Sequence, residues 1–405
     1  MTENGILGLF ARPSNIVVLI LLIDIFIGRL NTKGSEIMKK RIFPKSLLSV
    51  VVMFGILAFS GVLSAQGMSQ QAFERVKEVQ ERHTHHLLGV RGIEGTAIGL
   101  NRNARPALKV FVSKWDVAGI PRNLDSIPVQ VVVTGKFYAL AKGGIPGKPP
   151  VEEPPVEEPP TPDAEEPVDP TARFDRPVPI GVSTGHPAIT AGTIGCRVTD
   201  TDRNVYALSN NHVYANSNIA TIGDDETPGD AVLQPGTYDG GGLDDDYDDV
   251  IGTLAAFEEI YFYGRDNTID AAIALSSDAL LDNKTPPDGY GMPQSETLTA
   301  AVGQKVKKYG RTTGLTKGSI LAVNATVDVY YNSEIARFVG QIVISPGSFS
   351  AGGDSGSLIV FDGKGRTKRD DRKPIGLLFA GSDLYTIANP IDEVLTKLDV
   401  SIDGE

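Results

Sequence analysis

Ser355 stands in the segment of this chain that is best suited to nucleophilic chemistry. Residues 352–357 read Gly-Gly-Asp-Ser-Gly-Ser and directly precede the apolar run Leu358–Phe361. That run predicts a strand, so the serine occupies a glycine-rich turn at the strand's entrance. Glycines allow a tight backbone that exposes the hydroxyl, and they let the N–H groups of the turn point at a substrate carbonyl. The chemistry that suits this turn is acyl transfer by an activated serine.

A serine hydroxyl is a poor nucleophile until a neighbouring imidazole accepts its proton. Only two of the five histidines, His186 and His212, lie in residues 180–405. His212 follows an apolar strand and the polar segment 209–211, so it can present its ring at the rim of a barrel. His186 precedes Pro187, where packing in a turn is the simpler role. We predict that His212 is the base, with His186 as the alternative.

Asp270 opens the run Asp-Ala-Ala-Ile-Ala, whose small and apolar residues would bury its carboxylate. A buried, ionised carboxylate requires a hydrogen-bond donor. A histidine N–H is a suitable donor, and the bond holds the ring in the tautomer that leaves its other nitrogen free for serine. Asp266 is the alternative, in the turn 264–267, where we expect exposure to solvent. The predicted triad therefore follows the chain order His212, Asp270, Ser355.

The elements that must position these residues are short strands. Residues 180–405 contain many apolar runs separated by Gly, Asp and Asn turns, which predicts an all-β sandwich or barrel. Only residues 390–398 have a helical pattern. The region is long enough for two packed small barrels.

A small α+β domain is predicted at residues 69–142. Phe73, Val76, Val79, His83 and Leu87 recur at helical spacing, and strand-like runs follow at 95–100, 107–112 and 127–133. We expect this domain to be a regulatory region or a pro-region.

A linker is predicted at residues 143–179. It contains Val-Glu-Glu-Pro-Pro twice, at 151–155 and 156–160. Proline and glutamate at this density favour an extended tether over a core, so we expect two separated domains.

The N-terminus has the pattern of a secretory signal. The apolar run 47–63 follows Met-Lys-Lys-Arg at 38–41 and ends in small residues, so residues 38–65 are predicted to be a signal peptide. A membrane anchor is the alternative, because about 20 apolar residues can span a bilayer. Met38 is then the expected start, with Met1 as the alternative, and residues 1–37 an upstream over-translation. We expect a secreted or periplasmic protein that meets a membrane only through its signal segment.

Composition excludes several classes of protein. The formal net charge of −12 argues against a nucleic-acid partner, since phosphate binding relies on Lys and Arg. Cys196 is the only cysteine, which excludes an internal disulfide and a cysteine metal cage. We expect Cys196 to be a buried structural thiol.

Residues 180–405 resemble the chymotrypsin-like (trypsin-like, PA-clan) serine proteases. More closely, they resemble secreted bacterial trypsin-like proteins that are similar to the plant narrow-leaf proteases. The motifs that carry the resemblance are GTIGCRV (192–198), VYALSNNHV (205–213), DAAIA (270–274), YGRTTGLTKG (309–318) and GGDSGS (352–357). The resemblance implies a mainly β fold of two six-stranded barrels with a C-terminal helix.

The resemblance also implies the remaining parts of an active site. The backbone N–H groups of Gly353 and Ser355 would form the oxyanion hole. Phe349 stands where relatives that cut after Lys or Arg have an aspartate, so a small or apolar residue is expected before the scissile bond. The implied substrate pocket consists of Phe349, Ala380, Gly381 and Ser382.

An acidic loop offers a metal-site hypothesis. Oxygen ligands as dense as those of Asp244, Asp246 and Asp248 can hold calcium, although a solvated acidic loop is the simpler interpretation. No cofactor is expected to be required.

The function that these features predict is that of a serine endopeptidase acting on a protein or peptide substrate. One alternative is a catalytically silent binding or scaffold protein on a protease fold. Another is an esterase, although the chain lacks the Gly-x-Ser-x-Gly elbow and the alternating α/β pattern of that class. The oligomeric state is left open.

Overall fold

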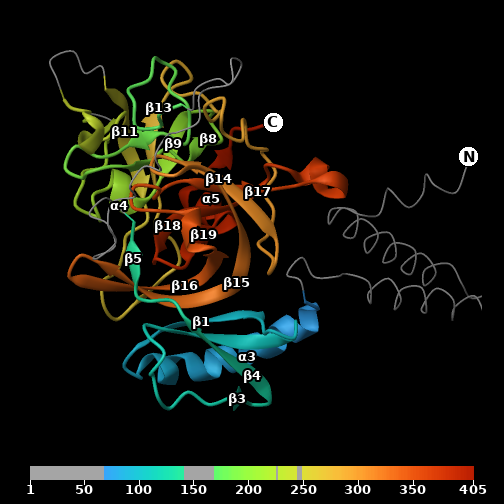
Figure 1. Cartoon of the computed structure of the whole chain (residues 1–405). Helices are drawn as coiled ribbons and strands as arrows, with labels where there is room; N and C mark the ends of the chain where they lie inside the picture. Colours follow the sequence, from blue (N-terminus) through green and yellow to red (C-terminus); the bar gives the residue numbers. More distant parts are fainter. Residues whose placement is uncertain (1–67, 141–167, 225–226, 244–248) are drawn as a thin grey trace, which may run out of the picture. The chain divides into compact units, whose positions relative to one another are not determined.

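The computed structural model describes residues 68–140, 168–224, 227–243 and 249–405, which belong to one compact unit (Figure 1). The upstream segment 1–37, the signal peptide 38–65 and the predicted calcium ligands Asp244, Asp246 and Asp248 lie outside these ranges. In the parts that the structure does describe, every helix falls short of the length or the apolar character needed to cross a bilayer.

The first sheet of the region 180–405 has six antiparallel strands. In spatial order they are β10 (Ala231–Leu233), β11 (Val250–Phe257), β13 (Ala272–Ser276), β9 (Val205–Ser209), β8 (Cys196–Thr199) and β20 (Ser401–Ile402). Alongside lie the strand pair β6 (Ser183–Thr184) and β7 (Gly192–Thr193) and the short helices α4 (Asn211–Tyr214) and η3 (Thr237–Asp239). Cys196 is buried in this core with Leu208 and Ile273, and burial raises the pKa of its thiol. The thiol is buried, as the sequence predicts.

The second sheet closes into a six-stranded antiparallel barrel, because β14 pairs with both its first and its last neighbour. The strands, in order around the barrel, are β14 (Lys305–Gly310), β15 (Gly314–Tyr331), β16 (Glu334–Ser345), β19 (Thr386–Pro390), β18 (Pro374–Gly381) and β17 (Leu358–Phe361). The attached elements are β12 (Asp266–Asn267), parallel to β16, and the helices η4 (Gly347–Phe349), η5 (Gly365–Asp370) and α5 (Ile391–Leu398). The predicted mainly β fold with a C-terminal helix is confirmed.

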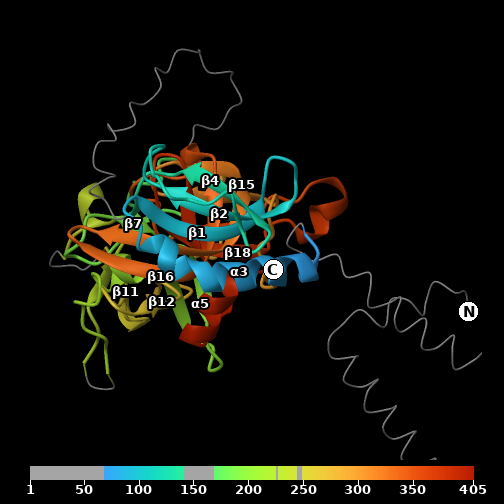
Figure 2. The same ribbon diagram turned by 90° about the horizontal axis from the view of Figure 1, so that it is seen from below.

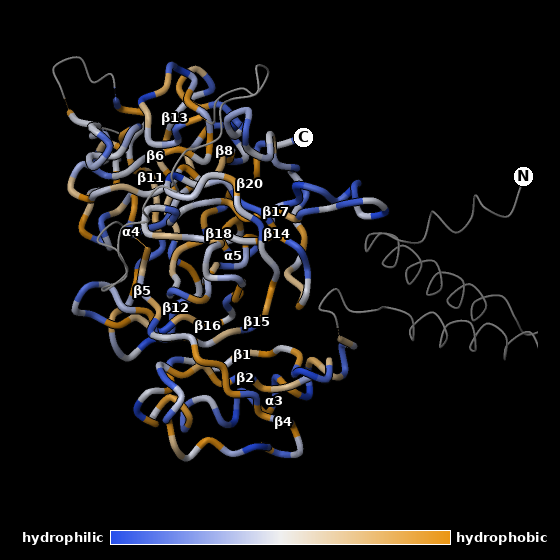
Figure 3. Tube along the Cα trace, viewed as in Figure 1, coloured by the Kyte–Doolittle hydropathy of each residue, from blue (hydrophilic) through white to orange (hydrophobic). Residues whose placement is uncertain are grey.

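Hydropathy follows these elements. In Figure 3 the strands carry apolar stretches, whereas the projecting connection with η5 is hydrophilic. Helix α5 lies against β18 and β19 and buries Ile391 and Val394 in a cluster that the barrel shares with the first sheet. This burial explains the helical pattern at the C-terminal end.

The N-terminal region has the predicted α+β composition. It consists of α3 (Gln70–Leu88), β1 (Ile93–Leu100), β2 (Pro106–Val112), β3 (Asn123–Leu124), β4 (Ile127–Val133) and β5 (Phe137–Ala139). Helix α3 begins where the Ser69 hydroxyl accepts a hydrogen bond from the Ala72 N–H at 3.3 Å. Figure 2 shows α3 lying along the layer of β1, β2 and β4.

The N-terminal region shares a sheet with the second barrel, which differs from the separated domain that the sequence suggests. Strand β1 pairs with β15, with Thr96 opposite Thr326 and Ile98 opposite Val323. Apolar residues of both parts, such as Val76 and Ile320, also belong to one buried cluster. The proline-rich composition describes the connecting segment alone and carries no information on whether the regions that it joins touch.

The predicted linker, residues 143–179, is too long at its C-terminal end. Folded structure after the linker begins before residue 179. Val178 is buried and donates its N–H to the Leu280 carbonyl at 2.9 Å, and Arg173 forms an ion pair with Asp249 at 2.5 Å. Residues 168–179 therefore belong to the region of the first sheet, because Val178 and Arg173 have their partners there.

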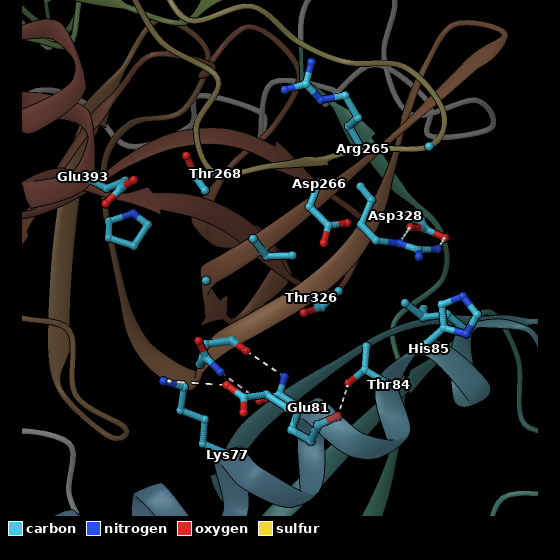
Figure 4. A pocket seen from close by; sticks show the side chains of 18 of the residues that line it. Lys77, Glu81, Thr84, His85, Arg265, Asp266, Thr268, Thr326, Asp328 and Glu393 are labelled. Atoms are coloured by element: carbon cyan, nitrogen blue, oxygen red, sulfur yellow. Dashed lines mark hydrogen bonds and ion pairs between the residues drawn. The ribbon is translucent and has the colours of Figure 1, made fainter.

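A cavity of about 1080 Å³ separates part of α3 from the second barrel (Figure 4). Lys77, Glu81 and Thr84 of the helix lie on one side, and Thr326 and Asp328 of β15 lie on the other. None of the three predicted triad residues lines this hollow. Its lining mixes charged, polar and apolar side chains.

Candidate active site

Helix α4 positions His212 at the end of β9. The chain leaves the strand at Ser209 and forms a single helical turn whose Val213 and Tyr214 are buried in the first core. The Asn211 side-chain amide donates to the Glu258 carbonyl and to the Asn218 side chain, both at 2.7 Å. These anchors fix the orientation of the turn and therefore of the imidazole.

His212 and Asp270 are brought together as the sequence predicts. Nδ1 of His212 lies 2.5 Å from Oδ2 of Asp270, and the His212 backbone N–H donates to Oδ1 at 3.2 Å. Asp270 is fully buried and His212 is 3% exposed. The bond assigns the proton of the neutral ring to Nδ1, so Nε2 carries the lone pair that can act as a base.

Tyr331 is a third partner of this pair. Its hydroxyl donates to Oδ2 of Asp270 at 2.7 Å, and its ring meets the His212 ring edge-on at 5.9 Å between centroids. Burial, reinforced by the charge of Asp270, raises the pKa of Tyr331 well above its usual value. The phenol therefore stays protonated and remains a donor to the carboxylate.

Ser355 lies on a turn that needs its glycines. Gly353 and Gly356 have φ values of +97° and +94°, which side chains disfavour. Asp354 holds the turn from within: its carboxylate accepts from the Thr312 N–H at 2.9 Å and from the Thr313 hydroxyl at 2.7 Å.

Lys308 compensates the charge of Asp354. Its Nζ lies 3.4 Å from Oδ2 of Asp354, and both side chains are completely buried. Burial lowers the pKa of Lys308, and the neighbouring carboxylate opposes that shift. The Ser355 turn is therefore held in part by groups within the same barrel.

Thr193 of β7 joins the turn to the histidine side of the site. Its N–H donates to the Ser355 carbonyl at 2.7 Å, and its own carbonyl accepts from the Ser209 hydroxyl at 2.8 Å. Because Ser209 is the last residue of β9, one threonine connects the strand leading to His212 with the turn that bears Ser355.

The structure does not form the bond between base and nucleophile. The Ser355 hydroxyl donates to the Phe379 carbonyl at 3.3 Å, and Nε2 of His212 is buried without a hydrogen-bond partner. Catalytic hydrogen bonds are often long or misaligned before substrate is aligned for reaction.

The implied oxyanion hole and pocket lie beside Ser355. The Gly353 N–H donates to the Leu140 carbonyl at 2.7 Å, so this donor of the implied hole is occupied by the chain itself.

Among the implied pocket residues, Phe349 is fully buried on η4, and Ala380 and Gly381 belong to β18. Ser382 follows β18 and accepts from the N–H groups of Leu384 and Tyr385.

The alternative triad residues are placed elsewhere. His186 bonds to Asp230 at 3.1 Å and accepts from the Ala188 N–H, which matches the turn-packing role. Asp266 is exposed on β12.

The metal-site hypothesis concerns the acidic loop before Asp249. Asp249 itself is held by Arg173, and the described residues contain no cluster that could hold a metal.

Sequence reasoning missed Tyr331, Thr193 and Lys308. Tyr331 and Lys308 sit in strands, where tyrosine and lysine are ordinary, and Tyr331 lies 61 residues from Asp270. Thr193 lies in the motif 192–198 and Lys308 directly precedes the motif 309–318, but neither motif indicates a role for these two side chains.

Comparisons with known proteins found a family model and solved structures that are similar to parts of this chain. A family model described as the Nal1 C-terminal domain matches residues 292–386, which include the Ser355 turn but less than a quarter of the chain. No curated protein matches the chain.

Several solved proteases are similar in structure. A glutamic acid specific serine protease shares 22% identity with a TM-score of 0.38, covering 56% of this chain and 100% of its own. Protease A of Thermobifida fusca shares 18% identity with a TM-score of 0.37, covering 56% of this chain and 100% of its own. Nocardiopsis protease shares 16% identity with a TM-score of 0.36, covering 56% and 99%.

Proposed function

We propose that the protein is a secreted serine endopeptidase that works through a Ser355–His212–Asp270 triad and an acyl-enzyme intermediate. The observation that carries the proposal is the buried His212–Asp270 bond of 2.5 Å beside a glycine-rich serine turn. It leaves Nε2 of His212 as a base with no competing partner. The signal-like pattern at 38–65 supports secretion.

The chemistry follows from the positions of these groups. After a rotation of its side chain toward His212, the Ser355 hydroxyl gives its proton to Nε2 and its oxygen attacks the scissile carbonyl carbon. Asp270 stabilises the imidazolium that forms, and the Gly353 N–H stabilises the oxyanion. The imidazolium then protonates the leaving amine, and water hydrolyses the resulting ester by the same route in reverse.

Replacing Ser355 by alanine tests the mechanism. Peptide hydrolysis by Ser355→Ala should fall by at least about 10,000-fold, because the nucleophile is gone while the fold remains. Hydrolysis is measured with fluorogenic peptides, and folding by circular dichroism. The exposed Ser333→Ala variant is the matched control and should keep full activity. Equal hydrolysis by Ser355→Ala and the wild type would reject the proposal.

A catalytically silent binding protein is the second candidate. The observation in its favour is that the Ser355 hydroxyl bonds to the Phe379 carbonyl and not to His212. A fluorophosphonate probe separates the two candidates, because it labels a serine only when a base activates it. A silent protein leaves Ser355 unlabelled in every variant.

A further inference from the structure

We propose that residues 136–140 occupy the substrate groove of the candidate active site as the chain's own first substrate. Leu140 then precedes the bond to be cut, and the enzyme takes substrates with leucine at that position. This inference rests on the proposed endopeptidase function and names the substrate class of the same site.

The backbone of this segment binds as an added strand. In β5, Ala139 pairs antiparallel with Ala380 of β18, and Tyr138 pairs with Gly381. The Leu140 N–H continues the ladder by donating to the Phe379 carbonyl at 3.1 Å. Extended peptides bind many proteins in this way, with affinity from main-chain bonds and selectivity from side-chain pockets. Figure 1 shows β5 running from the N-terminal region toward α4, the helix of His212.

The Leu140 carbonyl occupies the position of a reacting carbonyl. It accepts the Gly353 N–H at 2.7 Å, within the range expected of an oxyanion-hole donor. The Ser355 hydroxyl bonds to the Phe379 carbonyl, the acceptor that Leu140 N–H also uses. The Phe379 carbonyl thus binds both the Leu140 N–H and the Ser355 hydroxyl, while Gly353 binds the Leu140 carbonyl. These bonds place Leu140 next to Ser355.

The Leu140 side chain fills an apolar pocket. It is 2% exposed and belongs to the same buried cluster as Phe349. A Cβ atom added to Gly381 would lie 3.2 Å from Cδ1 of Leu140, so the glycine leaves room for the leucine side chain. The pocket residue Phe349 supplies no charge, which favours leucine over lysine, arginine or glutamate.

The segment is held from its other side as well. Phe137 and Tyr138 pair in parallel with Val329 and Tyr330 of β15, and the Phe137 ring packs edge-on against Phe111 at 6.0 Å. Lys136 lies over the Tyr330 ring at 4.3 Å. While the segment is in place, Ser355 and His212 are 0% and 3% exposed, so no other peptide reaches them.

Cutting follows the chemistry already described. The Ser355 oxygen bonds to the Leu140 carbonyl carbon as its proton moves to His212. The bond from Leu140 to Ala141 then breaks, and the Ala141 nitrogen takes that proton. Water hydrolyses the Leu140 ester, which yields a Leu140 carboxylate, a free amine at Ala141 and the original serine.

The experiment maps the cut and measures access to the site in the full chain. The wild type and Ser355→Ala are incubated, and their termini are identified by mass spectrometry. Fluorophosphonate labelling rates are compared for freshly purified wild type, Leu140→Asp and Trp115→Asp. Trp115 is 77% exposed in the same N-terminal region, so its variant controls for a new aspartate. Fluorogenic peptides with Leu, Lys or Glu before the bond are then compared.

We expect the wild type to yield a fragment ending at Leu140 and Ser355→Ala to stay intact. Leu140→Asp should be labelled at least about tenfold faster than Trp115→Asp, because a tethered segment competes at millimolar effective concentration. The leucine peptide should be cut at least about tenfold faster than the other two. The cut-site map needs no variant and stands even where Leu140→Asp fails to fold.

Two results overturn the inference and are distinguishable. If the wild type is labelled and cuts peptides, but not after Leu140 and without preference for leucine, the docked-substrate inference fails and the proposed function stands. If no variant is labelled and no peptide is cut, the endopeptidase proposal fails and the inference fails with it.

Discussion

At the scale of single residues, Asp270 is the group that links the imidazole to the rest of the candidate site. It accepts from the His212 ring, the His212 backbone and the Tyr331 hydroxyl, while its own N–H donates to the Asn389 side chain at 3.1 Å. A buried carboxylate with this many hydrogen-bond donors is held in one position. The orientation of the imidazole therefore depends on residues from three different strands or turns.

Tyr331→Phe should lower kcat/KM for a leucine peptide by about tenfold to a hundredfold, since a hydrogen bond to a charged group is worth about 1.5–3 kcal/mol. The phenyl ring still packs against Phe262 and Phe338, so the fold should persist. Steady-state kinetics and circular dichroism measure the two effects. Tyr263→Phe, at a 62% exposed tyrosine, is the control. Matching rates for the two variants would remove Tyr331 from the site.

The sequence could predict Ser355, His212 and Asp270 but not Tyr331 or Asn389. The first three combine a reactive side chain with a local motif of turns and apolar runs. Tyr331 ends a long strand in which alternate residues are buried, so its pattern is that of an ordinary core residue. Only the fold, which brings the end of β15 beside Asp270, gives the Tyr331 hydroxyl this partner.

At the scale of elements, the Ser355 turn is stabilised by a charge pair within the barrel. Asp354 has Lys308, Thr312 and Thr313 as partners, all from β14 and the turn that follows it. A carboxylate buried at 0% exposure requires these donors at all times. The conformation of the Ser355 turn is thus coupled to β14, in addition to its bonds with Thr193 of β7.

Lys308→Met should lower the free energy of unfolding by about 3 kcal/mol, because it leaves the Asp354 charge buried without its counter-charge. Chemical denaturation in the Ser355→Ala background measures this without interference from self-cutting. Lys305→Met on the same strand is the control, since Lys305 is exposed. An effect no larger than that of the control would show that the threonine donors suffice.

Strand β5 illustrates what a sequence cannot reveal about an element. Residues 137–139 read Phe-Tyr-Ala and stand before the proline-rich segment, so they look like the end of the small domain. Their partners on β15 and β18 are backbone groups, which leave no mark in the amino-acid pattern. The predicted strands at 95–100, 107–112 and 127–133, by contrast, are rich in apolar residues and match β1, β2 and β4 closely.

At the scale of the whole molecule, the N-terminal region and the second barrel form one continuous sheet. Gln80 of α3 reinforces it by donating to the Asn324 carbonyl at 2.8 Å and accepting from the Asn324 side chain at 2.9 Å. Shared strands and a shared core make cooperative unfolding the expectation. A change in the N-terminal region should therefore alter the stability measured for the entire unit.

Lys109 on β2 provides a pH test of this coupling. Burial lowers its pKa to about 8, so the unfolded chain binds its proton more tightly than the folded one. Below about pH 8 the buried charge of Lys109 therefore lowers the free energy of unfolding. This cost disappears as the pH rises from about 8 to 10.5. From pH 7 to 9.5 the wild type should gain about 2 kcal/mol relative to Lys109→Met.

Denaturation of both proteins in the Ser355→Ala background, followed by circular dichroism, measures the difference. Lys114→Met is the control, because the Lys114 side chain is 70% exposed. A pH profile of Lys109→Met that parallels the wild type would contradict either the lowered pKa or the coupling.

The hydrogen bond from Gly353 to the Leu140 carbonyl has a consequence for how such an enzyme would be switched on. Scission of the Leu140–Ala141 link leaves every rung between β5 and β18 intact, and Asp354 already has its counter-ion. The cut would thus complete no missing part of the active site. It would only separate residues 136–140 from the chain that follows them. Activity should then depend on how readily residues 136–140 leave the groove, because β1 and the shared core still hold the fragment on the barrel.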